Sequence, residues 1–289
     1  MSLRRSISRI VRTPAPEPGF IGPGHEAVML VNPVEFVRNY PFILLMDDRV
    51  DRPEGPLGGA HPHAGFETVT LTLEGSIRDR DEGTLNAGDV LWMTAGSGVI
   101  HNEEMVSSGE VRVLQLWLTL SKAERWVAPR FERIEGGDAP VRREDGAEIR
   151  LYSGSSGELR SPTRNHVPVT LADVRLEPGA RIEQDLPASY NGFVYVIEGA
   201  ARVGADGSLL VAGQVGWLDR PTQEGESALL LVGDEGGARM ILYAGEPTGD
   251  PIVTQGPFVG DTRQDITRVY REYLEGRFPK MSELAAKAG

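Results

Sequence analysis

Two short histidine motifs are the part of this 289-residue chain whose residue types could do chemistry. The chain has five histidines, and three of them lie in His61-Pro62-His63 and His101-Asn102-Glu103. In an extended strand, residues two positions apart point to the same face, so each motif can direct two side chains at one point. Three imidazoles and one carboxylate around one point are typical of a transition-metal site. The two motifs therefore predict such a site.

The composition limits what else the chain can be. It has no cysteine, which excludes disulfides, thiolate ligands and a thiol nucleophile, so nitrogen and oxygen must hold any metal. The net charge of -12 argues against direct binding of nucleic acid but leaves room for a basic protein partner. No apolar run approaches the roughly 18 residues that a membrane span needs. We therefore expect a cytoplasmic protein with no membrane contact.

The elements that must position the histidines are predicted to be strands. The chain has 35 glycines and 20 prolines, and many of them separate short apolar or alternating runs between about residues 26 and 245. The arginine-rich first twelve residues are expected to form a short solvated arm or an edge strand. Helical periodicity appears only near the end, where the pattern predicts a helix over residues 262–276.

The strand after the first motif alternates clearly between two residue types. Threonine occupies the even positions 68, 70 and 72, and Val69, Leu71 and Leu73 occupy the odd positions. The odd set is expected to face the interior. If the strand is regular through residue 62, His61, His63 and Glu67 share that inward parity.

An internal repeat predicts two similar β domains. Glu74-Gly75 followed by Gly88-Asp89-Val90-Leu91-Trp92 recurs 124 to 125 residues later as Glu198-Gly199 and Gly213-Gln214-Val215-Gly216-Trp217. We expect domains at residues 20–135 and 145–250, a connection within residues 135–157, and an extension at residues 251–289. The second copy's counterparts of the four candidate ligands are Asp185, Pro187, Glu226 and Ala228, so one metal per chain is predicted.

Longer strings around both motifs resemble the pirin family of the cupin superfamily. They run from His61 to Thr70 and from Gly88 to His101, and a third set is Gly256-Pro257-Phe258-Val259 with the helix that ends near Phe278. The similarity covers most of the chain from about residue 40 onward. The resemblance implies an all-β fold of two tandem double-stranded β-helix (cupin) barrels with a C-terminal helix, and one mononuclear metal in the first barrel.

The resemblance also implies a ligand set of His61, His63, His101 and Glu103, with iron as the usual metal. Glu104 adjoins the expected carboxylate, but strand alternation favours Glu103 because it faces the same way as His101. Glu67 stands at a ligand position of many other cupins though not of pirins, and we expect it behind the ligands or as a reserve ligand.

Several neighbours of these motifs are candidates for the wall of a substrate pocket. They are Phe66, Trp92, Met93 and Trp117, with Gln115 on the strand that follows the ligands. The alternative for the first four is ordinary barrel core, and their apolar character favours it.

Two hypotheses of function follow from the predicted site. Open positions on a six-coordinate ion suit iron, manganese, nickel or cobalt, whereas zinc prefers four ligands and would be nearly closed. In the first hypothesis the chain is a quercetin 2,3-dioxygenase-type enzyme that takes oxygen and an aromatic enol such as a flavonol, with Glu103 as the proton acceptor. In the second it is a non-enzymatic, iron-dependent redox sensor that regulates a protein partner. A metal with open positions inside a barrel favours the enzyme.

Overall fold

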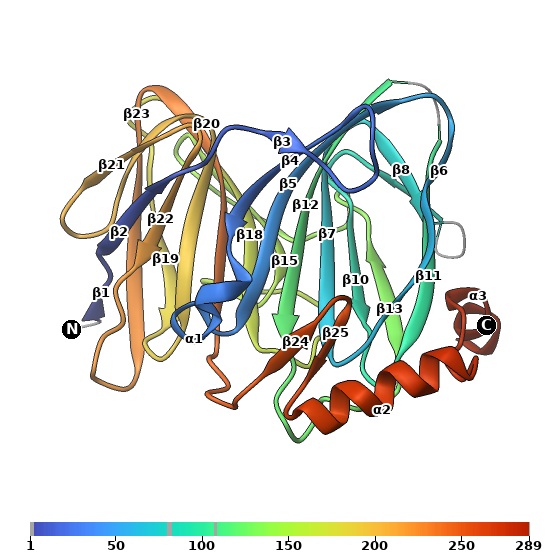
Figure 1. Cartoon of the computed structure of the whole chain (residues 1–289). Coiled ribbons are helices and arrows are strands. Elements are labelled where there is room, and N and C mark those ends of the chain that lie inside the picture. Colours follow the sequence, from blue (N-terminus) through green and yellow to red (C-terminus); the bar gives the residue numbers. More distant parts are fainter. Residues whose placement is uncertain (1–2, 80–82, 107–108, 289) are drawn as a thin grey trace. The chain divides into compact units, whose positions relative to one another are not determined.

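Strands make up most of the regular structure (Figure 1). The computed structural model describes residues 3–79, 83–106 and 109–288. The described chain folds into two compact units, each built from two stretches. The first unit contains residues 15–137 and 248–288, and the second contains residues 3–14 and 138–247. The prediction of an all-β chain with a C-terminal helix is confirmed. No helix in the described ranges is long and apolar enough to cross a membrane.

The first unit contains two main antiparallel sheets and the small two-stranded sheet β24-β25. The larger has the strand order β13-β10-β7-β12-β5-β4-β3, and the smaller has the order β6-β11-β8-β9. The larger sheet consists of β3 (Glu17–Pro18), β4 (His25–Val31), β5 (Phe42–Arg52), β7 (Phe66–Glu74), β10 (Val90–Thr94), β12 (Gly109–Thr119) and β13 (Arg130–Ile134). The smaller consists of β6 (Gly55–His63), β8 (Ser76–Asp79), β9 (Gly83–Asn86) and β11 (Val99–Met105).

The remaining elements of the first unit are short strands and helices. They are the 3-10 turn Pro33–Glu35, α1 (Phe36–Asn39), β24 (Val253–Gln255), β25 (Phe258–Gly260), α2 (Arg263–Leu274) and α3 (Met281–Ala288). Thr262 caps the start of helix α2: its side chain accepts from the Asp265 backbone N–H, and the Asp265 carboxylate accepts from the Thr262 backbone N–H. Its Ile266 and Val269 pack with Phe258 of β25. The predicted helix is therefore present, and α3 follows it without having been predicted.

The second unit is built on one ten-stranded sheet. Its main path runs β14-β15-β18-β23-β20-β22-β2, with β1 and β19 on β23 and β21 on β20. The ten strands are β1 (Leu3–Arg4), β2 (Ile7–Arg12), β14 (Val141–Glu144), β15 (Ala147–Ser153), β18 (Val169–Leu176), β19 (Arg181–Pro187), β20 (Asn191–Val203), β21 (Ser208–Val211), β22 (Gln214–Leu218) and β23 (Glu226–Gly245). The short strands β16 (Ser155–Ser156) and β17 (Leu159–Arg160) form a separate two-stranded sheet.

Paired strands occupy both the predicted connection and the arginine-rich N-terminal stretch, and the second confirms the edge-strand alternative. The chain passes from the first unit to the second between residues 137 and 138, within the predicted connection of residues 135–157. Most of that stretch is nevertheless not a linker, because β14 pairs with β15 and β15 pairs with β18. The arginine-rich arm forms β2, an edge strand on β22, and Arg5 beside it is fully buried and binds Asp219.

Aliphatic side chains fill the interior of the second unit. The side chains at its centre are fully buried. They include Leu186 of β19, Val194 of β20, and Leu229, Leu231 and Leu242 of β23. Strands β19 and β23 pair in regular register from Arg181↔Val232 to Pro187↔Glu226. This regular pairing lets every second side chain enter the core.

Candidate metal centre

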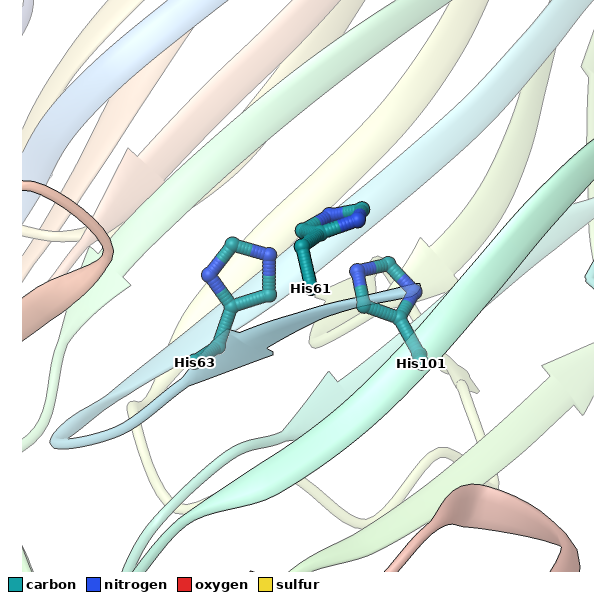
Figure 2. Close-up of side chains that lie close together, drawn as sticks. All are labelled: His61, His63 and His101. Carbon is teal, nitrogen blue, oxygen red and sulfur yellow. The ribbon is translucent and has the colours of Figure 1, made fainter. Parts of the chain in front are cut away.

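The three histidines of the two motifs lie together in the first unit. His61 and His63 stand at the end of β6, and His101 stands on β11, which pairs antiparallel with β6. His61 is opposite His101, and His63 is opposite Val99. Figure 2 shows the three imidazole rings converging on one space, with ring centroids 4.2 to 5.0 Å apart. One ring nitrogen from each lies within 4.8 Å of the other two, so together they could hold a metal ion.

An irregularity in the pairing of β6 and β11 places His61. Glu103 pairs with Leu57, and the register then shifts so that His101 pairs with His61. Gly58 and Gly59 lie in this bulge, with φ values of 74° and 91°. Residues other than glycine rarely adopt this backbone conformation. The carbonyl of Gly59 then accepts a hydrogen bond from His61 Nδ1 at 3.1 Å. A neutral imidazole that donates through Nδ1 carries its lone pair on Nε2, the arrangement common in metal-binding histidines.

Burial keeps His63 ready to bind a cation. Desolvation lowers the pKa of His63 well below its usual range, and the nearby His101 and His61 lower it further. A backbone hydrogen bond to Pro257 opposes this only in part. His63 is therefore neutral at pH 7, and a metal ion does not have to displace a proton from it.

Two aromatic rings, those of Phe66 and Trp117, pack against the ring of His63. Phe66 is fully buried, and its ring centroid lies 4.4 Å from that of Trp117 and 5.2 Å from that of His63. Trp117 itself lies 5.4 Å from His63. The predicted pocket residue Phe66 thus supports a histidine, whereas Trp117 contributes to the cavity wall described next.

The histidines open onto a cavity of about 640 Å³ inside the first unit. Most of its wall is apolar. The lining residues are Phe20, Ile21, His25, Met29, Pro33, Leu44, Met46, Asp48, Val50, Leu57, His61, His63, Ile77, His101, Glu103, Val113, Gln115, Trp117, Gly256 and Pro257. An apolar cavity with a few polar groups at defined places is the usual form of a small-molecule site.

The predicted carboxylate ligand lies on the wall of the same cavity. Glu103 is half-buried and lines the cavity, whereas the neighbouring Glu104 directs its carboxylate to Arg78 at 3.5 Å. Alternation along β11 thus separates the two acids as expected. Within the described residues, the compact group of ligand atoms contains the three histidines and no carboxylate. Ligation by Glu103 stays a prediction.

The register of the large sheet decides which predicted residues reach the cavity. Gln115 of β12 pairs with Thr70 of β7, and Trp117 pairs with Thr68. Directly paired residues share a face, so the threonine positions of β7 lie on the cavity side. Thr70 donates a hydrogen bond of 2.8 Å to Gln115 Oε1. The predicted lining residue Gln115 is therefore held in place on the wall.

The predicted inward parity of Glu67 was wrong. His63 ends β6 and Phe66 begins β7, and between them Gly65 turns the chain with a φ of 88°. Glu67 consequently lies on the opposite face of β7, where it is fully buried and accepts a 2.7 Å hydrogen bond from Thr94. It is absent from the cavity wall formed by the described residues.

Trp92 and Met93 are core residues, as the alternative interpretation held. Trp92 pairs with Val69 on the face of β7 away from the cavity. Met93 packs in a small cluster with Val99 and Met281. Neither residue belongs to the described wall of the cavity.

Sequence reasoning missed two polar residues of the cavity. His25 and Asp48 both line it, and His25 Nε2 lies 2.8 Å from Asp48 Oδ1. Alternation along β5 carried the signal, since Leu44, Met46 and Asp48 are two residues apart and share the cavity face.

Comparison with known proteins gives consistent matches along the chain. Residues 35–118 match the family model described as "Pirin", and residues 171–279 match "Pirin C-terminal cupin domain". Pirin-like protein 2 of Arabidopsis thaliana is 36% identical over 247 residues, covering 82% of this chain and 75% of that protein.

Two solved structures are similar over nearly the whole fold. GK1651 from Geobacillus kaustophilus is 40% identical with a TM-score of 0.80, covering 87% of this chain and 100% of that one. Quercetin 2,3-dioxygenase from Acinetobacter baumannii is 27% identical with a TM-score of 0.82, covering 96% and 99%.

Proposed function

Because this chain belongs to the pirin family, we propose that its histidine cluster holds one divalent transition metal and that the protein is a quercetin 2,3-dioxygenase-type enzyme. The family models also establish both units as cupin domains, so the bicupin fold implied by the sequence is confirmed. The proposed substrates are oxygen and a flavonol or related aromatic enol.

One observation supports this proposal most strongly. Three imidazoles from two paired strands converge at the wall of an apolar cavity of about 640 Å³. Imidazole ligands with a nearby carboxylate suit non-heme iron. Manganese, nickel, cobalt and zinc can also bind imidazole nitrogen. The similarity to the Acinetobacter baumannii quercetin 2,3-dioxygenase points to the flavonol class.

The proposed chemistry assigns a task to each part of the cavity. When bound, the metal supplies Lewis acidity and open coordination positions for the enol oxygen of the substrate and for molecular oxygen. The apolar wall around Leu44, Met46 and Trp117 accepts a flat ring system and excludes water. Glu103, on the same wall, accepts the proton that the enol loses. His61 and His63 are held as donors by the Gly59 carbonyl and by the aromatic pair behind His63.

Oxygen uptake tests the proposal. Protein loaded with Fe(II) is given quercetin, beside metal-free protein and a His101→Ala variant. We expect uptake that requires metal and disappears in the variant. No uptake by protein shown to contain iron would contradict the enzyme proposal and favour the iron-dependent regulatory alternative, which a comparison of partner binding by the two oxidation states would then examine.

A further inference from the structure

The cavity has a second polar group that the proposed chemistry does not use. Asp48 is only 8% exposed and lines the apolar wall. Its Oδ1 receives a hydrogen bond of 2.8 Å from His25 Nε2. Among the described residues, no other hydrogen bond reaches the Asp48 side chain. One carboxylate oxygen is therefore left to accept a donor.

The surroundings of His25 establish the direction of this hydrogen bond. The backbone N–H of Ile21 donates to His25 Nδ1 at 3.3 Å, so Nδ1 carries a lone pair and Nε2 carries the proton. The turn that leads to His25 packs closely against its ring. A Cβ atom added at Gly19 would lie only 2.0 Å from His25 Nδ1, so this position has room for glycine alone. His25 thus donates to Asp48 through Nε2, and the hydrogen bond from Ile21 fixes that orientation of the ring.

The position of Asp48 separates it from the histidine cluster. On β5, Asp48 pairs with Val113, whereas Leu44 pairs with Trp117, the residue in contact with His63. Four residues of extended chain span about 13 Å. A ligand that contacts both Asp48 and the histidine cluster must therefore carry two polar functions separated by an apolar body of about this length.

We propose that Asp48, oriented by His25, is a second anchor that accepts a hydrogen bond from a phenolic hydroxyl of the ligand. This inference rests on the proposed function and narrows its substrate class to aromatic enols with at least one further ring hydroxyl. A buried carboxylate needs a donor, and a neutral phenol supplies one without the cost of desolvating a second charge.

Binding of two flavonols to the metal-loaded protein without oxygen tests the anchor. Quercetin carries ring hydroxyls, whereas 3-hydroxyflavone keeps the enol and ketone and lacks them. We expect wild-type protein to bind quercetin about tenfold more tightly, the effect of one charge-assisted hydrogen bond. A wild-type protein without this preference would overturn the inference on its own, before any variant is made.

Asp48→Asn reverses the chemistry of the anchor at constant shape. His25 takes the amide oxygen, so the NH₂ group, which is a donor, faces the cavity. The quercetin preference should fall about tenfold while binding of 3-hydroxyflavone stays within about twofold. Asp51→Asn removes the same charge from an exposed position of the same strand and should keep the preference. A folded Asp48→Asn protein with the full preference would contradict the inference.

Oxygen uptake by the same proteins distinguishes the two proposals. An Asp48-dependent preference without turnover would support the anchor and overturn the dioxygenase. Turnover with a preference that does not depend on Asp48 would overturn the anchor alone. If neither flavonol bound to metal-loaded protein, both proposals would be overturned.

Discussion

The two cupin domains of this chain share a scaffold and differ in what their interiors contain. The second unit is filled by aliphatic side chains such as Leu186, Leu229 and Leu231. The first unit keeps a cavity of about 640 Å³ with three histidines on its wall. The same fold thus encloses a packed aliphatic core in one copy and a histidine-lined cavity in the other, because the inward-facing positions of a few strands carry different residues.

The contrast is strongest at one pair of strands in each unit. Strands β19 and β23 pair without irregularity, whereas β6 and β11 contain the glycine bulge at Gly58 and Gly59. The regular pair alternates strictly between core and surface. In the bulged pair, the Gly59 carbonyl instead accepts a hydrogen bond from His61, and His61 lies directly opposite His101. A small change in backbone pairing therefore accompanies the change from core to site.

The structure also corrects the predicted counterparts of the ligands. Asp185 pairs with Ala228, and Pro187 pairs with Glu226, but these positions alternate with the buried set that faces the core. The inward positions on these strands are Gln184, Leu186, Ser227 and Leu229. The predicted counterparts were one residue out of phase, and a shift of one residue moves a strand's side chains to the other face. Neither set contains histidine.

The largest expected effect is the loss of metal binding by the first unit when one of its three histidines is removed. We expect His101→Ala to lower metal affinity by more than about 100-fold, because loss of a direct ligand exceeds the 10- to 100-fold cost of losing a supporting group. Metal content after dialysis measures this. His166→Ala, in the second unit, is the matched control and should keep one metal per chain. Equal retention of metal by both variants would break the contrast between the units.

Changing Glu103 sharpens the comparison by separating metal binding from chemistry. Glu103→Gln keeps the size of the side chain and removes its basicity. We expect turnover of quercetin to fall by about 100-fold, within the range for a lost general base. Metal content measured beside the rate shows whether the effect lies in ligation or in proton transfer. Turnover at the parent rate would remove Glu103 from the proposed chemistry.

Truncations should show that one interior is packed and the other is hollow. Leu229→Ala removes a fully buried side chain from the second unit, and we expect it to lower the free energy of unfolding by about 2–5 kcal/mol. Met46→Ala, on the cavity wall, should cost about 1 kcal/mol because part of its surface already faces empty space. Calorimetry of both variants checks this. Equal costs would indicate that the cavity wall is packed as tightly as the core.

The smallest expected effect is a pH dependence confined to the first unit. The folded pKa of His63 lies below its unfolded value near 6.5, so between the two pKa values the unfolded state binds the extra proton. The contribution of neutral His63 is complete above about pH 6.5 and is lost as pH falls below it, by up to about 1.4 kcal/mol per pH unit. Thermal unfolding of metal-free protein at pH 7.5 and 5.5 measures this loss. An unchanged pH dependence in His63→Asn would exclude His63 as the cause.

Local spacing was enough to predict the centre of the site. His61, His63 and His101 were found from their two-residue intervals and from the strands around them, and the structure places them together. The helix near the C-terminus was predictable because its amphipathic pattern and its capping residues agree. The strings around the histidines also identified the family that the comparisons establish.

Other features depend on information that no single strand contains. Both faces of β7 are buried, so alternation could not show that Thr68 and Thr70, rather than Val69, lie on the cavity side. Glu67 was misplaced because the chain turns at Gly65. The contact between His25 and Asp48 joins residues of different strands whose pairing had to be known first. A cytoplasmic location, a protein partner and the lack of nucleic-acid binding stay predictions.

The division of each unit between two chain stretches has a consequence for synthesis. Strand β2 leaves the ribosome about 200 residues before β22, the strand with which it pairs. Helix α2, which follows the whole of residues 138–247 in the sequence, supplies Ile266 and Val269 to the core around Phe258 in the first unit. Neither unit can finish folding as a contiguous nascent segment. A plasmid that expresses residues 15–137 alone would omit α2, and one that expresses residues 138–247 alone would leave the edge of β22 uncovered.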